Sequence, residues 1–210
     1  MREFAKEVGI SRSRVLQLIH KGDVRARRVA NQWIIDSSQL DHKAASSRPL
    51  SAKMGEALIQ ILSGDPAPQG LDPAENARLR KRIDQLKNHE DPSILLRSWL
   101  KNRAKKIELN ANINDLSKLR MSSEIVLSGA SNSKSGMSDS NILEAYIAES
   151  SLQEFRKKFL LVNSENPNIL LHVVQKQVRN PLPLGYLLAD LAESRGPRER
   201  DKVKELVKNI

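Results

Sequence analysis

The sequence predicts an α+β protein, and three features of the 210-residue chain carry that prediction. Near the N-terminus, two short helical segments precede two β-type runs, a pattern typical of a winged helix-turn-helix. A middle stretch has helical periodicity and strong helix-start signals. After it, four apolar runs alternate with helical segments, which predicts a mixed α/β domain. The expected parts are a winged helix-turn-helix over 1–42, a linker over 43–50, a basic helical segment over 51–106 and a C-terminal α+β domain over 107–210.

The first twenty residues, MREFAKEVGISRSRVLQLIH, contain the side chains that a helix-turn-helix requires. Ala5 is small enough for the point where the two helices nearly touch. Gly9 supplies a turn residue that can adopt a left-handed conformation, and Ser11 can cap the second helix. Apolar residues stand at the spacings that fill the space between the helices: Phe4, Val8, Ile10, Val15 and Leu18.

The second helix, over residues 11–20, is expected to read DNA. Its apolar side faces inward, and its polar side carries Arg12, Ser13, Arg14 and Gln17. In this motif the N-terminal residues of the recognition helix meet base edges in the major groove. Arginine suits guanine and glutamine suits adenine, because each can form two hydrogen bonds with that base. We expect a base contact from at least one of Arg12, Ser13 and Gln17, although each of them could instead touch phosphate or face solvent.

The predicted wing follows. Gly22 is a candidate C-cap, and the runs VRARRV and QWIID, joined around residues 30–32, predict a β-hairpin. A basic hairpin after a recognition helix is typical of a wing, whose cations hold the DNA backbone or enter a minor groove. The candidate DNA-binding residues are Ser11, Arg12, Ser13, Arg14, Gln17, Lys21, Arg25, Arg27, Arg28 and Asn31.

Composition is consistent with a nucleic-acid partner. The formal net charge of +10 favours polyanions, although a basic protein with no such partner is an open alternative. The absence of cysteine excludes disulfides and thiolate zinc sites and suits a reducing cytoplasm. Aromatic residues make up 3% of the chain, which argues against stacking on single-stranded bases and favours duplex DNA. No apolar run approaches the roughly 18 residues of a membrane span, so no membrane partner is expected.

The middle segment has three helix starts. Ser51 can cap a helix running to residue 63, Asp72 with Pro73 and Glu75 begins a second, and Asp91 begins a third. The last two helices carry many cations. These cations could form a second DNA contact, or they could be a solvated face whose long stems cover apolar neighbours.

In the C-terminal domain, the runs KIELNA, EIVLSG, ILEAYI and ILLHVVQ predict strands. Helices are expected near 114–120, 151–159, 183–194 and 197–209. Residues 128–140 are rich in small side chains and lack the glycine spacing of a phosphate-binding P-loop, so we expect a mobile loop there.

The chain offers little catalytic chemistry. Its four histidines are scattered, and His172, inside an apolar run, is expected to be a packed core residue. Asp190 and Glu193 share a helix face beside basic residues, a pattern typical of a surface. No nucleophile elbow or dinucleotide fingerprint occurs. We therefore expect no enzyme activity, no cofactor and no metal.

Two family resemblances extend these predictions. The block FAKEVGISRSRVLQLIHKGDVRARRVANQWIID resembles the winged helix-turn-helix of MerR-like regulators and phage excisionases. The whole series then includes RPLSAKMGEALIQILSG, LRSWLKNRA, LSGAS, LEAYI, NILLHVV and PLPLGYLLADLAESRGPRERDKVKEL. That series is similar to AbiEi-like antitoxins of type IV toxin–antitoxin systems, of the actinobacterial type.

The resemblance implies a cytoplasmic repressor that binds promoter repeats of its own operon through residues 11–17 and 25–28. It also implies antitoxin activity of the C-terminal domain against a nucleotidyltransferase-like toxin, with direct contact left open. Repeated half-sites favour paired binding as a homodimer on DNA. The alternatives are a simple transcriptional or recombination accessory factor, and an antitoxin that neutralises its toxin by direct binding.

Overall fold

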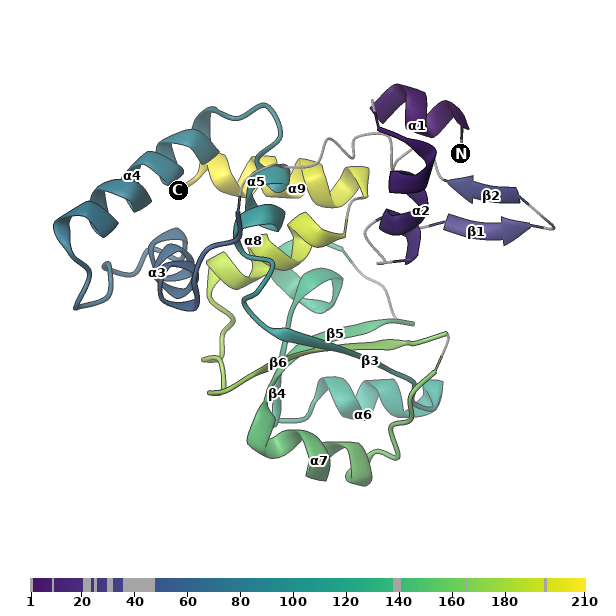
Figure 1. Cartoon of the computed structure of the whole chain (residues 1–210). Helices are drawn as coiled ribbons and strands as arrows, with labels where there is room; N and C mark the ends of the chain where they lie inside the picture. Colours follow the sequence, from purple (N-terminus) through teal and green to yellow (C-terminus); the bar gives the residue numbers. More distant parts are fainter. Residues whose placement is uncertain are drawn as a thin grey trace. The chain divides into compact units, whose positions relative to one another are not determined.

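The computed structural model describes residues 2–8, 10–20, 24, 26–29, 32–35, 48–137, 141–164, 166–194 and 196–210. The chain divides into two compact units, an N-terminal one over 1–46 with 195–197 and a larger one over 47–194 and 198–210 (Figure 1). Helices and a mixed sheet are both present, so the predicted α+β class is confirmed. Among the described helices, none has the length and apolar character to cross a membrane.

The N-terminal unit has two helices and a strand pair in the predicted order. Helices α1 (Arg2–Val8) and α2 (Arg12–His20) precede strands β1 (Ala26–Val29) and β2 (Gln32–Ile35), which pair antiparallel. Between the helices, the Ile10 amide donates to the Ala5 carbonyl at 3.0 Å. Gly9, the predicted turn residue, lies outside the described residues. The core consists of Phe4, Ala5, Val15, Leu18 and Val24, with Ile10, Ile19 and Ile35 packed against it.

A four-stranded sheet forms the middle of the larger unit. Its strands are β3 (Lys105–Leu109), β4 (Ile125–Leu127), β5 (Leu143–Ala148) and β6 (Ile169–Val174). Each coincides with one of the four predicted runs, although β3 begins one residue before its run and β5 ends one residue after its run. The order is β3-β6-β5-β4, with β5 and β6 parallel and the other neighbours antiparallel. Side chains alternate between the two faces of a strand, so each face of this sheet has its own core.

One face of the sheet is covered by α6 (Leu116–Arg120) and α7 (Glu149–Lys158) (Figure 1). Leu143, Ala145 and Ile147 of β5 point into this layer, where they join Phe155 of α7. The intervening positions of β5 point to the opposite face. Tyr146 belongs to that second core, and Glu144 is also buried. The apolar side chains Leu143, Ala145 and Ile147 of β5 therefore lie on the face covered by α6 and α7, and Glu144 and Tyr146 lie on the opposite face.

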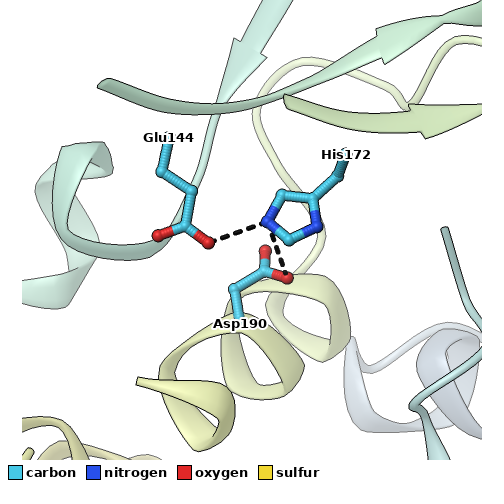
Figure 2. Close-up of side chains that lie close together, drawn as sticks. All are labelled: Glu144, His172 and Asp190. Atoms are coloured by element: carbon cyan, nitrogen blue, oxygen red, sulfur yellow. Dashed lines mark hydrogen bonds and ion pairs between the residues drawn. The ribbon is translucent and has the colours of Figure 1, made fainter. Parts of the chain in front are cut away.

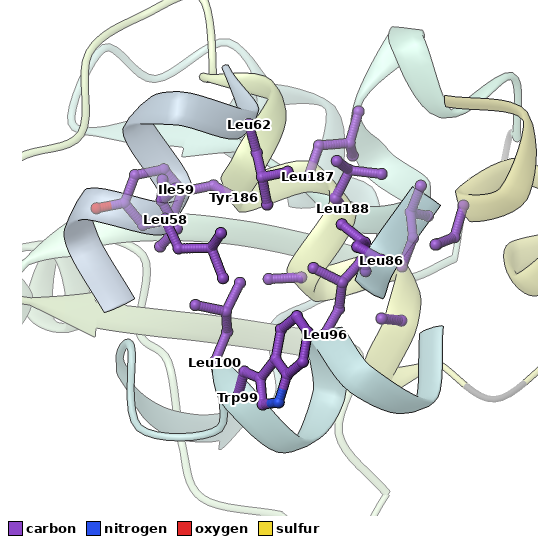
Figure 3. Packing of buried hydrophobic residues seen from close by; sticks show 14 of the residues in the cluster. Leu58, Ile59, Leu62, Leu86, Leu96, Trp99, Leu100, Tyr186, Leu187 and Leu188 are labelled. Carbon is purple, nitrogen blue, oxygen red and sulfur yellow. The ribbon is translucent and has the colours of Figure 1, made fainter. Parts of the chain in front are cut away.

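Five helices form the second core: α3 (Ala52–Leu62), α4 (Pro73–Asn88), α5 (Pro92–Trp99), α8 (Leu184–Glu193) and α9 (Pro197–Lys208). The three predicted caps are present: the side chains of Ser51, Asp72 and Asp91 accept backbone amides of α3, α4 and α5. Asp72 and Glu75 form a full capping box. Figure 3 shows leucines of α3, α4, α5 and α8 meeting in this layer.

The middle helices and the C-terminal elements share one core. Gly185 of α8 approaches α3 so closely that an added Cβ would lie 2.8 Å from the Ile59 Cα. Leu58 of α3 and Leu96 of α5 are in the same cluster as Leu188 of α8. The boundary expected at 106/107 therefore lies inside one compact unit, because the apolar faces of α3 and α5 are buried against α8.

Candidate nucleic-acid interface and a buried polar cluster

The exposed face of α2 carries the side chains predicted to read bases. Val15 and Leu18 are buried in the core of the N-terminal unit. Ser11, Arg12, Ser13, Arg14 and Gln17 are all exposed on the other side, at and after the start of the helix. We call these five residues the α2 face. The structure thus brings together half of the predicted DNA-binding residues.

The other predicted residues belong to the region around the hairpin. Arg28 is exposed on β1, and its backbone partner on β2 is Trp33. Lys21, Arg25 and Asn31 lie outside the described residues, and so does the side chain of Arg27. Residues 1–42 hold eight Lys and Arg against five Asp and Glu, so this part of the chain is cationic.

Hydrogen bonds order the α2 face internally. Ser11 Oγ accepts the Arg14 amide at 3.2 Å, which is the predicted N-cap, and lies 2.9 Å from Ser13 Oγ. One turn further on, Arg14 Nη1 donates to Gln17 Oε1 at 3.1 Å. Among the described residues, Arg12 has no hydrogen-bond or ion-pair partner.

The sequence left open whether the cations of α4 form a second DNA contact or a solvated face that covers apolar neighbours. Arg78, Arg80, Lys81 and Lys87 are exposed. Arg82, in contrast, lies over the Trp99 ring at 4.7 Å from its centroid, and its burial lowers the pKa of the guanidinium. At Arg82 the stem and head thus cover an apolar neighbour, as the second interpretation expects.

A second group of functional interest lies inside the larger unit, where we define the polar cluster as Arg103, Ser128, Glu144, Tyr146, His172, Asp190 and Glu193. Its centre is Arg103, whose side chain is 2% exposed. Arg103 donates from Nε to Asp190 at 3.1 Å and also from Nη2, and it binds Glu193 from Nη1 and Nη2 at 2.8 and 3.0 Å. Asp190, itself 0% exposed, also accepts from Tyr146 OH at 2.8 Å and from Ser128 Oγ.

These contacts fix the charges in the cluster. Burial opposes the charged form of Arg103, but the neighbouring Tyr146, Asp190 and Glu193 raise its pKa well above the usual value. Burial likewise opposes ionisation of Glu193, but Arg103 and Lys106 outweigh it and lower the pKa of Glu193 to about 2. Burial is also the main cause that raises the pKa of Tyr146. At neutral pH the cluster therefore contains a guanidinium bound by Glu193 as a carboxylate, with Tyr146 as a neutral phenol.

His172 joins this cluster from β6 (Figure 2). Its Nε2 lies 2.8 Å from Glu144 Oε1 and 3.6 Å from Asp190 Oδ1, and its ring stacks on Tyr146 with centroids 4.8 Å apart. The histidine is fully buried, as its apolar surroundings in the sequence predict. The prediction of a surface position for Asp190 was wrong: its partner Arg103 stands 87 residues away in sequence, so no local pattern could reveal the pairing.

The trio Glu144, His172 and Asp190 has the donor types of a metal site, with one ligand atom of each within 4.8 Å of the others. Two observations argue against a cation at this position. Both oxygens of Asp190 already accept hydrogen bonds, and the Arg103 guanidinium supplies the positive charge. In addition, a metal-bound histidine normally donates from its second ring nitrogen to a carboxylate or carbonyl, whereas Nδ1 of His172 has no hydrogen-bond partner within the described part of the chain. The arrangement is therefore that of a structural hydrogen-bond network.

The small-residue loop takes part in this network. Residues 129–131 and 133–135 form two 3₁₀ turns, and Ser128 and Ser135 are buried. Gly129 has φ +50°, and an added Cβ would overlap the Glu144 carboxylate. The beginning of the predicted mobile loop thus packs tightly against β5, because only a glycine leaves room for that carboxylate. Residues 138–140 lie outside the described residues.

A cavity of about 1040 Å³ adjoins the cluster, between α3 on one side and residues 99–105 and 173–179 on the other. Arg103 and Tyr186 are among its lining residues, and Tyr186 OH donates to Glu56 at 2.9 Å. Burial raises the pKa of Tyr186, and the neighbouring Glu56 adds to that effect. The cavity is thus of mixed polar and apolar character, and Arg103 is the residue of the polar cluster that lines it.

Comparison of the chain with protein-family models, with curated proteins and with solved structures finds no match.

Proposed function

We propose that the N-terminal unit binds duplex DNA with sequence preference and that the chain represses the promoter that carries its operator. The observation that carries this proposal is the α2 face. A short helix buries Val15 and Leu18 and exposes Arg12 and Ser13 at its start and Gln17 near its middle. That is the part of a recognition helix that enters the major groove in helix-turn-helix proteins.

The hairpin supports the same function in a different way. Arg28 projects from a two-stranded antiparallel sheet that follows the recognition helix in the chain. A cation at such a place suits the phosphate backbone, which contributes affinity without base information. Trp33 is partly buried, and its ring contacts His20 edge-on with centroids 6.3 Å apart. This ring is thus engaged with the recognition helix, which favours a duplex over stacked single-stranded bases.

A gel-shift series on the native promoter and on a shuffled duplex of equal length tests the DNA proposal. Arg12→Ala and Gln17→Ala should lower the ratio of promoter affinity to shuffled affinity. Arg28→Ala should weaken both duplexes alike and reduce the slope of log affinity against log salt by about 0.9. Lys157→Ala, which removes an exposed cation from α7, is the matched control and should change neither quantity. An unchanged ratio in both the Arg12 and the Gln17 variants would disprove base reading by α2.

For the larger unit we propose the antitoxin role that the resemblance implies, against a nucleotidyltransferase-like toxin. Its support is the resemblance, together with a core of its own that is distinct from the DNA-reading unit. The full chain carrying Arg12→Ala, Gln17→Ala and Arg28→Ala together should no longer bind operator but should still restore growth when co-expressed with the neighbouring toxin gene from a foreign promoter. If the unmodified chain restores growth only when the toxin gene keeps its native promoter, and the triple variant restores it from neither promoter, protection is instead assigned to repression. A stable co-purified complex would favour direct neutralisation.

A further inference from the structure

The Arg14–Gln17 pair carries an inference about base preference that rests on the proposed DNA-binding function. The two side chains stand three residues apart on one exposed face of α2, where helix geometry makes them neighbours. Arg14 Nη1 donates to Gln17 Oε1 at 3.1 Å. This hydrogen bond determines which end of the Gln17 amide is directed toward Arg14 and which end is left for a ligand.

An unpaired glutamine reads adenine with both ends of its amide. Its oxygen accepts from the adenine N6 amino group while its nitrogen donates to N7. In this chain the oxygen already faces a guanidinium. An adenine amino group that approached Oε1 would bring its hydrogens toward the positive charge of Arg14, so the adenine arrangement is disfavoured.

The free end of the pair offers donors only. With respect to the residues that the structure describes, Gln17 retains both N–H groups of Nε2, and Arg14 retains the guanidinium N–H groups not directed at Oε1. In the major groove, guanine presents two acceptors, N7 and O6, whereas adenine presents one acceptor beside a donor. We infer that the Arg14–Gln17 pair reads guanine, with Arg14 acting as a positioning residue for the Gln17 amide. This differs from the adenine preference that glutamine alone suggests from sequence.

Selection of duplexes from a random library by the full-length chain, followed by sequencing, tests this inference. The base position that loses its preference in Gln17→Ala is the position that Gln17 reads. At that position the unmodified chain should enrich guanine over adenine by at least about threefold. Arg14→Ala should shift the same position toward adenine, because Oε1 then becomes free. Lys157→Ala should leave the preference unchanged.

The outcomes separate this inference from the function on which it rests. Enrichment of a motif with adenine at the Gln17 position, or an Arg14→Ala profile identical to that of the unmodified chain, would overturn the inference and leave sequence-specific binding intact. A Gln17→Ala profile identical to that of the unmodified chain would overturn it as well, since Gln17 would then read no base. Enrichment of no motif at all would refute the proposed function, and the inference with it. Thermal melting of both variants checks that these exposed substitutions leave the fold unchanged.

Discussion

Replacing Arg103 should destabilise the larger unit more than any exposed charge substitution. In Arg103→Met the side-chain volume is nearly kept, but Asp190 loses its charge partner while it stays 0% exposed. Removal of one member of a buried ion pair costs roughly 3–5 kcal/mol, because the other charge is left in the interior. For a unit of this size, that loss corresponds to a fall in melting temperature on the order of 6–20 °C. Arg103→Lys keeps the charge but loses the planar fork, so its melting temperature should lie between those of the unmodified chain and Arg103→Met.

Urea unfolding followed by tryptophan fluorescence measures this effect. The chain has two tryptophans, Trp33 in the N-terminal unit and Trp99 in the larger one, so a Trp33→Phe background reports on the larger unit alone. Arg179→Met is the matched control, because Arg179 binds Asp65 at 2.6 Å with its side chain 59% exposed. Exposed pairs contribute about 0–1 kcal/mol. Equal losses of unfolding free energy in the Arg103 and Arg179 variants would refute the structural role of the polar cluster.

Three further predictions concern the larger unit. The pKa of Glu193 is lowered from 4.5 to about 2, so its ionisation stabilises the fold above about pH 4.5, and that contribution is lost as the pH falls toward 2. The urea midpoint of Glu193→Gln should therefore be lower than that of the unmodified chain at pH 7. Between about pH 4.5 and 2 it should also fall less steeply than that of the unmodified chain. Gly185→Ala should cost roughly 1–3 kcal/mol in thermal unfolding because α3 and α8 must separate, whereas Gly55→Ala, whose Cβ would lie 3.8 Å from Leu100, should be neutral or stabilising. Asp72→Ala should cost about 1 kcal/mol through loss of the cap of α4, and unchanged stability would contradict that cap.

Local features of the larger unit were predictable, and its long-range features were not. The caps at Ser51, Asp72 and Asp91 act within three residues of their own side chains, so their spacing in the sequence is sufficient to find them. Each strand can likewise be recognised from a short run of mainly apolar residues in the sequence. The placement of β6 between β3 and β5 depends on long-range pairing, and no local pattern encodes it. The paired residues of β3 and β6 are 60 to 68 positions apart in the sequence.

The same distinction explains what could be foreseen of the two candidate sites. The α2 face follows from helical periodicity, which places Arg12 and Gln17 opposite Val15 and Leu18. The Arg14–Gln17 hydrogen bond also has a local signal, because a spacing of three residues makes neighbours on a helix. The polar cluster has no such signal, since its members come from β5, β6, α8 and the segments after α5 and β4.

The separation of the two cores makes the functional tests independent of each other. The core of the N-terminal unit and the cores of the larger unit share no residue. Substitutions at sites without shared partners usually have additive effects. Variants of the α2 face should therefore change DNA binding without altering the urea midpoint reported by Trp99, and Arg103→Met should do the reverse. A loss of operator affinity in Arg103→Met, at a temperature where the larger unit is still folded, would mean that the two units are energetically coupled. In that case the larger unit would regulate DNA binding, which would favour a transcriptional accessory factor over an antitoxin that acts apart from the operator.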